Sequence, residues 1–228
     1  SSAISCNLGL FPRHIKTLLD AYGQGMAKVG IYTGSLSFSD ISLKLPLNTY
    51  LAYMVGGLVR KTGCKIRPYE KVSGTTDRVI KEGMDVLVEA FSGNLSKEEA
   101  VAEVVSRFEA IETIRDGSVS HGDCQRPKVA IFGDLYARDN EVINQDLIHF
   151  IEEQGGEVIT TPFSSLVKMI ARPYLRKWFI EGHYLNVLSS KALYATATRL
   201  EKIYYSYFNR ILKEPPQAYD ESPQKILS

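Results

Sequence analysis

The first half of the chain alternates helical patterns of apolar residues with short runs rich in β-branched and aromatic residues. In the helical patterns, apolar residues recur every three or four positions, and each pattern predicts a helix. The patterns cover residues 12–23, 46–58, 75–93 and 96–113. The runs between them, KVGIYT at 28–33 and CKIRPY at 64–69, are typical of strands. We therefore expect residues 1–115 to form a partial α/β domain.

Local signals mark the ends of several of these elements. Ser96 and Glu99 form an S-x-x-E capping box, which predicts the start of a helix. Gly93 is expected to end the helix before it. The segment 115–126 is polar, carries two glycines and precedes Pro127. It is the best candidate for a domain boundary.

The second half of the chain begins with a strand, helix, strand pattern. KVAIF at 128–132 is a continuous apolar run of the kind that is buried on both faces of a parallel sheet. A helical pattern that starts near Glu141 and stops at two glycines leads to a second strand-like run, EVIT at 157–160. We expect residues 127–163 to form a βαβ unit of a second α/β domain.

Beyond residue 163 the pattern is wholly helical. Its clearest stretch has one apolar face, which predicts a core or domain-interface helix rather than a base-stacking platform. That face comprises Leu193, Ala197, Leu200, Tyr204, Tyr207 and Ile211. Residues 164–215 are expected to form a helical insert or lid, and 216–228 a loose tail. The predicted fold class is α/β, with Rossmann-like or flavodoxin-like parallel-sheet units and a helical C-terminal extension.

Composition and charge exclude several classes of function. The 228 residues include 27 Lys and Arg against 26 Asp and Glu, so no basic field is present to attract nucleic acid. No uninterrupted apolar stretch reaches the ~18 residues that a membrane span needs, and the first residues lack the order of a secretory signal. A cytoplasmic protein with neither a membrane nor a nucleic-acid partner is expected.

The loops that follow predicted strands are the places where an open α/β sheet binds ligands. The loop GSLSFSD after Thr33 is one of them, and the loop after 128–132 is much richer in polar groups. Its candidate residues are Gly133, Asp134, Tyr136, Arg138, Asn140 and Asn144. The forked guanidinium of an arginine, together with a carboxylate and amides in one loop, could bind an anionic ligand. The alternative is that these side chains cap the next helix and fix the loop. Neither loop has the glycine spacing of a nucleotide site.

A second polar group follows the run at 64–69. Arg67 and Glu70 lie there together with Gly74 and Asp77. Such residues usually pair with each other or satisfy loop carbonyls, and a ligand contact is the alternative.

Cysteine and histidine positions do not form a local metal motif. Cys6, Cys64 and Cys124 fall in separate segments, which favours structural or free thiols over a cluster site. The four histidines are scattered, and Cys124 with His121 lies in a glycine-containing linker that is poorly suited to a catalytic pair.

Two stretches, RPYEKVSGTTD at 67–77 and PKVAIFGDLYARDNEVINQDLIHFIEEQGGEVITTPF at 127–163, resemble a known family. The chain is similar, through most of residues 6–165, to large proteins related to 2-hydroxyacyl-CoA dehydratase and benzoyl-CoA reductase subunits, often labelled CoA-substrate-specific enzyme activases. That family typically has glutamate where this chain has Asp134.

The resemblance implies a pair of flavodoxin-like domains and a setting of ATP-driven, low-potential electron transfer that uses a [4Fe-4S] cluster. This chain matches neither the activase phosphate loops nor a later Pro-Phe-Gly-Cys-like motif, so it is expected to be an excised domain without a cofactor of its own. The resemblance makes Cys6 a cluster ligand only in combination with cysteines outside this chain.

Three hypotheses of function follow. The first is a non-catalytic module of such a reductase or activase, in contact with the remaining domains of a parent protein or with a partner subunit. The second is an α/β protein that binds a small anion, such as a CoA or nucleotide phosphate, through the loop from Gly133 to Asn144. The third is an independent protein-interaction module built on the aromatic C-terminal helices.

Overall fold

The computed structural model describes residues 11–31, 44–114, 126–133, 135–160 and 175–213. The chain divides into two compact units, Ser1–Pro46 and Leu47–Ser228, and the boundary falls in the first turn of a long helix. The predicted boundary at 115–126 lies almost entirely outside the described residues.

In its described residues, the first unit contains an α-helix, a 3-10 helix and the first residues of the long helix that crosses the boundary. Helix α1 (Phe11–Tyr22) begins where Pro12 predicts a first turn, and none of its residues is buried. Its apolar residues form one exposed stripe: Phe11, Ile15, Leu18 and Tyr22. Met26–Lys28 form the 3-10 helix η2, and residues 29–31 are irregular. The strand predicted at 28–33 is therefore wrong in its described part, where a tight turn follows Gly23 and Gly25.

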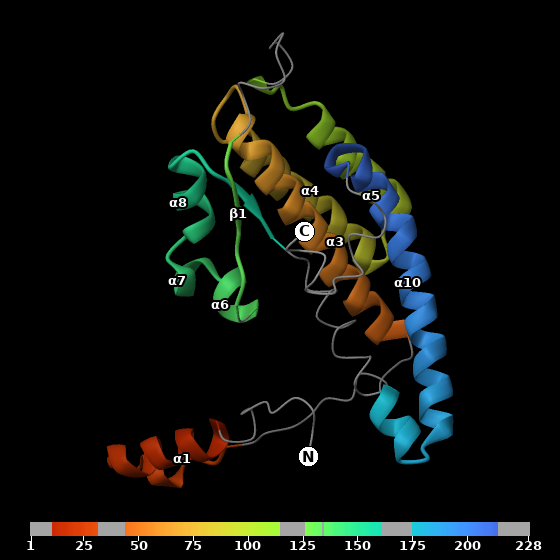
Figure 1. Cartoon of the computed structure of the whole chain (residues 1–228). Coiled ribbons are helices and arrows are strands. Elements are labelled where there is room, and N and C mark those ends of the chain that lie inside the picture. Colours follow the sequence, from red (N-terminus) through yellow and green to blue (C-terminus); the bar gives the residue numbers. More distant parts are fainter. Residues whose placement is uncertain (1–10, 32–43, 115–125, 134, 161–174, 214–228) are drawn as a thin grey trace. The chain divides into compact units, whose positions relative to one another are not determined.

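The second unit is built around packed helices. These are α3 (Lys44–Ile66), the 3-10 helix η3 (Arg67–Tyr69), α4 (Thr75–Ser92), α5 (Lys97–Glu109) and α10 (Tyr184–Leu212). Figure 1 shows α3, α4 and α5 beside one another, with α10 running along α5. The core that joins them includes Met54, Leu58, Val59, Leu87, Val101, Val104, Val105, Phe108, Phe208 and Leu212.

The helix ends follow their sequence signals closely. Gly93 (φ 94°) ends α4, and the backbone N–H groups of Gly93 and Asn94 donate to the carbonyls of Ala90 and Glu89. The side chain of Ser96 accepts the backbone N–H of Glu99 at the start of α5, as the capping box predicts. Helix α5 ends at Glu109, four residues before the predicted end.

The predicted α/β fold with Rossmann-like or flavodoxin-like sheets is wrong. Helices make up 74% of the described residues and strands 5%, and the sheet has two strands. The run at 64–69 forms the last turn of α3 and then η3, and Cys64, Ile66 and Tyr69 in it are buried. A short apolar run has too few residues to separate a strand from a buried helical turn.

Residues 128–159 form a small βαβ unit. Strands β1 (Lys128–Ala130) and β2 (Glu157–Ile159) pair in parallel, with Lys128 opposite Glu157. Between them lie α6 (Leu135–Asp139), α7 (Glu141–Asn144) and α8 (Leu147–Glu153). The helix predicted from Glu141 is broken in two because Gln145 and Asp146 both have φ 56°. All three residues of β1 are exposed, so the expectation that this strand is buried on both faces is wrong.

The long helix α10 covers the core with a face slightly rotated from the predicted one. Tyr204 is buried, and Leu200, Tyr207 and Ile211 pack at the edge of the core, as the pattern predicts. The deepest contacts come from Phe208 and Leu212, which are 0% and 1% exposed. Residues 175–180 are also helical, and the predicted tail at 216–228 lies outside the described residues.

Candidate functional site

A network of charged side chains joins the βαβ unit to the helices, and Arg67 is its centre. Arg67 is the first residue of η3, Asp77 lies in the first turn of α4, and Glu152 lies in the last turn of α8. Arg67 Nη1 donates to Glu152 Oε1 and Oε2 at 3.0 and 2.8 Å, and Arg67 Nε donates to Asp77 Oδ1 at 2.8 Å. The planar guanidinium therefore bridges two carboxylates from different elements.

Burial makes the pairing of Arg67 with Glu152 important. Burial alone lowers the pKa of Arg67, but the charges of Glu152 and Asp77 outweigh it and hold that pKa above its ordinary value. Burial also raises the pKa of Glu152, more than the neighbouring guanidinium lowers it. The carboxylate is thus a costly buried charge that depends on its partner.

His149 extends this network on the outer side of α8. Its Nδ1 lies 2.5 Å from Asp146 Oδ1, and its Nε2 lies 3.9 Å from Asp77 Oδ2. Burial lowers the pKa of His149 and Arg67 opposes the ring's charge, but the hydrogen bond to Asp146 and the two carboxylates leave it above the ordinary value. The protonated ring is therefore favoured between these two acids.

Cys64 lies beneath the network in a small apolar cluster with Ile131 and Val158. The thiol is buried, with 1% exposure. Burial, followed by the charge of Glu152, raises the pKa of Cys64 to about 11. A thiol in this state is protonated at neutral pH and is poorly suited to act as a nucleophile or a metal ligand.

A second contact between the βαβ unit and the helices centres on Tyr69. Its hydroxyl donates to Glu157 Oε2 at 2.8 Å and accepts the backbone N–H of Arg126 at 3.1 Å. The Arg126 guanidinium lies 5.7 Å from the centre of the Tyr69 ring and donates to the Glu152 carbonyl. Tyr69 and Glu157 are both buried, so this contact has little access to solvent.

Glu70 caps the start of α4. Its two carboxylate oxygens accept the backbone N–H groups of Gly74 and Thr76, each at 2.7 Å. A carboxylate at this position satisfies free N–H groups and interacts favourably with the helix dipole. The side chains of Glu70 and Arg67 thus both have structural partners, and these are backbone N–H groups and carboxylates rather than each other.

The loop from Gly133 to Asn144 also has local roles for its described residues. Gly133 is exposed, with φ 136°, while Asp134 and the side chain of Tyr136 lie outside the described structure. Arg138 is buried and pairs with Asp139 at 2.8 Å, and Asp139 also pairs with Arg60 at 3.0 Å. These contacts give Arg138 an internal acidic partner.

The two asparagines of this loop organise the chain around α7. Asn140 is the N-cap, and its side chain accepts the backbone N–H of Ile143 at 3.1 Å. Asn144 donates to the carbonyl of Arg138 at 2.6 Å and accepts the backbone N–H of Leu147 at 3.2 Å. These contacts match the structural alternative, in which the loop residues cap the next helix.

The residues present do not fit a cluster site in the described part of the chain. Cys6 and Cys124 lie outside it, and no three His, Cys, Asp or Glu side chains gather there as metal ligands. Cys64 is a single thiol among apolar neighbours. In the same residues no helix is both long and apolar enough to cross a membrane.

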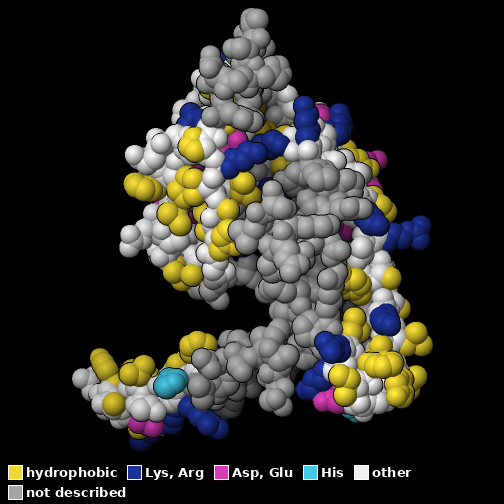
Figure 2. Space-filling model, in the orientation of Figure 1, with side chains coloured by type: hydrophobic (Ala, Val, Ile, Leu, Met, Phe, Trp, Pro, Cys, Tyr) yellow, Lys and Arg dark blue, Asp and Glu magenta, His cyan; other side chains and the backbone are white. Residues whose placement is uncertain are grey.

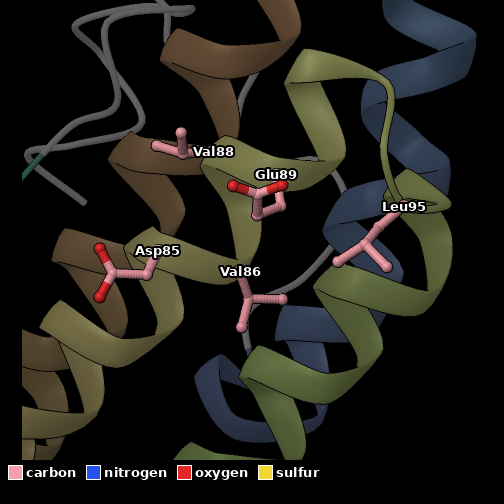
Figure 3. A pocket seen from close by; sticks show the side chains of 5 residues that line it. All are labelled: Asp85, Val86, Val88, Glu89 and Leu95. Carbon is pink, nitrogen blue, oxygen red and sulfur yellow. The ribbon is translucent and has the colours of Figure 1, made fainter.

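A surface depression of about 430 Å³ lies at the C-terminal end of α4. Figure 3 shows Val86 from α4 and Leu95 from the following loop facing each other across it. Asp85 and Glu89 add two carboxylates, and Glu89 accepts a hydrogen bond from Asn94 at 2.6 Å. This acidic rim is unsuited to a phosphate ligand.

The sequence did not single out Glu152 and His149 of the network, or Glu157 of the contact with Tyr69. Glu152 follows Ile148 by four positions, so a charge at an apolar helical position was an available signal. Glu157 begins a strand-like run and gives no signal of its burial beside Tyr69. The sequence does not show which distant elements will meet.

No family model, curated protein or solved structure matches the chain. The resemblance noted in the sequence therefore remains an inference from the two stretches that carry it. The functional argument depends on the geometry of the βαβ unit and the residues around it.

Proposed function

We propose that this chain is a non-catalytic module of a 2-hydroxyacyl-CoA dehydratase-like, ATP-dependent reductase system, and that it binds another domain of that system. Two arguments support this proposal. The stretches at 67–77 and 127–163 carry the resemblance, and four of their candidate polar residues are already engaged within the fold, namely Arg67, Glu70, Arg138 and Asn140. A partner-binding role would instead use exposed apolar side chains.

The observation that carries the proposal is an exposed apolar face of the two-stranded sheet. Successive strand residues point to opposite faces. One face, with Ile131 and Val158, packs beneath α8 with Cys64. On the other face Glu157 is buried beside Tyr69, but further along Ala130 is exposed, Ile159 is 39% exposed, and Phe132, two residues past the end of β1, is 68% exposed. We call Ala130, Phe132 and Ile159 the sheet face.

Further exposed apolar side chains lie on α7 and α8 of the same βαβ unit. Val142, Ile143 and Phe150 are 88%, 50% and 58% exposed. Figure 2 shows hydrophobic side chains gathered over the βαβ unit. Parallel sheets are normally covered on both faces by helices, so the fitting partner is the apolar face of a helix from another α/β domain. Exposed apolar surface of this kind is typical of a protein–protein contact.

The anion-binding hypothesis has weaker support. Arg138 is buried against Asp139, and the depression on α4 has an acidic rim. A phosphate in either place meets carboxylates that repel it. The partner-binding role requires none of these side chains to leave its contact.

The test measures binding of the purified chain to the 2-hydroxyacyl-CoA dehydratase of the same organism, by anaerobic sedimentation. We expect a complex with the wild-type chain, weakened about tenfold or more by Phe132→Asp, which places a charge on the sheet face. Val72→Asp is the matched control, because Val72 is 70% exposed on the loop before α4. It should bind as the wild type does.

Three results contradict the proposal. No complex forms at ~100 μM, which is weaker than specific interfaces usually show. Alternatively, Phe132→Asp binds as tightly as Val72→Asp, so that the sheet face is not the contact. In the third case the isolated chain hydrolyses ATP or converts an acyl-CoA, and the module is then catalytic.

A further inference from the structure

His149 connects α8 and its N-cap residue to the first turn of α4. It lies in α8, its ring contacts Asp146 before that helix, and its outer nitrogen faces Asp77 in the first turn of α4. Asp77 in turn pairs with Arg67, which holds Glu152 of α8. Both ends of this series of contacts, His149 and Glu152, lie on α8. A change in the charge of His149 therefore affects the packing of that helix.

We propose that His149 is a pH-responsive latch, which holds α8 against the start of α4 when its ring is protonated and loosens it when the ring is neutral. The charged groups that face the ring are Asp146 and Glu152 on its own side, Asp77 of α4 and Arg67 of η3. Two of these acids lie near its nitrogens, whereas the guanidinium opposes its charge. The proposal is independent of the proposed function.

The direction of the effect follows from linkage. The pKa of His149 in the folded chain is above its ordinary value. A raised pKa means that the ring's contribution is fully present below its unfolded pKa of ~6.5 and is lost as the pH rises through the folded value. The latch is therefore closed in mild acid and loosened in mild base.

The contact of Tyr69 with Glu157 is a second link between the βαβ unit and the helices, in addition to His149. The Tyr69 hydroxyl donates to the Glu157 carboxylate of β2 and accepts the backbone N–H of Arg126. This contact keeps β2 in place when the ring is neutral. Loosening is therefore confined to α8, and it uncovers the buried thiol of Cys64.

Hydrogen exchange of the full chain tests the latch at about pH 6 and about pH 8, after correction for the intrinsic rates. Peptides over 147–153 should be protected ~3- to 10-fold more at the lower pH, because the charged ring adds contacts that must break when α8 opens. A peptide from α5, which lies in the helical core, should show no such difference.

Three variants separate the latch from a general pH effect. His149→Gln keeps a polar side chain that stays neutral, so its α8 protection at both pH values should equal the wild-type value at the higher pH. His149→Lys keeps a permanent charge and should remove the pH dependence. His14→Gln, on the exposed helix α1, is the matched control and should retain it. Circular dichroism confirms that each variant is folded.

Alkylation of Cys64 by iodoacetamide, located by peptide mass spectrometry, gives a second measurement at one pH. At about pH 6, His149→Gln should label at least ~3-fold faster than the wild type, because the thiol is exposed only on opening. The latch is refuted if His149→Gln keeps the wild-type pH difference in α8. It is also refuted if α5 shows the same difference as α8, or if Cys64 labels equally fast in both proteins.

Discussion

At the residue scale, the cost of burying charge determines how the βαβ unit is held. The side chains of Arg67 and Glu152 are 14% and 5% exposed, and their pairing replaces water that both groups have lost. Removing one member of such a pair leaves the other buried without compensation. Of these two residues, Arg67 was a candidate for ligand binding on its sequence pattern, and in the structure it forms this ion pair.

We predict that Arg67→Met destabilises the chain by about 3 kcal/mol, because Glu152 is left buried without its partner. The double variant Arg67→Met with Glu152→Leu should recover much of this loss, since it removes both charges. Urea unfolding followed by circular dichroism measures the two free energies.

Arg107→Met is the control for that experiment. Arg107 also pairs with two carboxylates, those of Glu82 and Glu103, but in an exposed position. Its loss should leave the free energy of unfolding close to the wild-type value, because water solvates all three groups. Equal losses for Arg67→Met and Arg107→Met would show that burial of the first pair is unimportant.

At the element scale, the sequence predicts best where a local signal fixes a helix end. The starts of α1 and α5 and the end of α4 follow from Pro12, Ser96 and Gly93, each of which acts on its own backbone. The run at 64–69 failed because its apolar side chains suit a strand and a buried helix equally. The single helix expected from Glu141 failed because Gln145 and Asp146 adopt positive φ, which no apolar pattern signals.

In the candidate site, too, contacts between residues close in sequence could be predicted, whereas contacts between distant residues could not. Asn140 and Asn144 lie close in sequence to the groups that they bind, so a capping role could be predicted for that loop. Arg67 and Glu152 are 85 positions apart, and Tyr69 and Glu157 are 88 apart. Their pairing depends on the packing of α8 and β2 against the helices, which local patterns cannot supply.

The packing of α10 leads to a prediction for that helix. Phe208 is 0% exposed within the core that α10 shares with α5, so Phe208→Ala should destabilise the chain by about 3–5 kcal/mol through lost burial and a cavity. Ile203→Ala on the same helix is the control, because Ile203 is 42% exposed and should cost less than about 1 kcal/mol. Thermal unfolding of both variants measures the difference. Comparable losses would mean that α10 packs through a different face.

At the scale of the whole molecule, the described chain offers a helical core, a small βαβ unit and an exposed apolar sheet face. The helical core holds the second unit together, and the charged network uses Arg67, Asp77 and Glu152 for internal ion pairs. The exposed apolar residues are the surface on which the proposed partner would bind. The fold itself differs from the flavodoxin-like domains that the resemblance implies, so the proposal depends on the two stretches and this surface rather than on fold likeness.

The last prediction concerns iron. A [4Fe-4S] cluster normally takes four cysteine thiolates, and the chain has three cysteines, of which Cys64 is buried among apolar side chains with its pKa raised to about 11. Anaerobic reconstitution of the chain with iron and sulfide should therefore give well below the ~4 irons per chain of a complete cluster. Cys64→Ser should leave the bound iron unchanged, because a protonated, enclosed thiol is not available as a ligand. Iron and acid-labile sulfide are counted in both proteins. A chain that binds about four irons with a cluster absorption band, lost in Cys6→Ala, would contradict this prediction and would make the module an electron carrier in its own right.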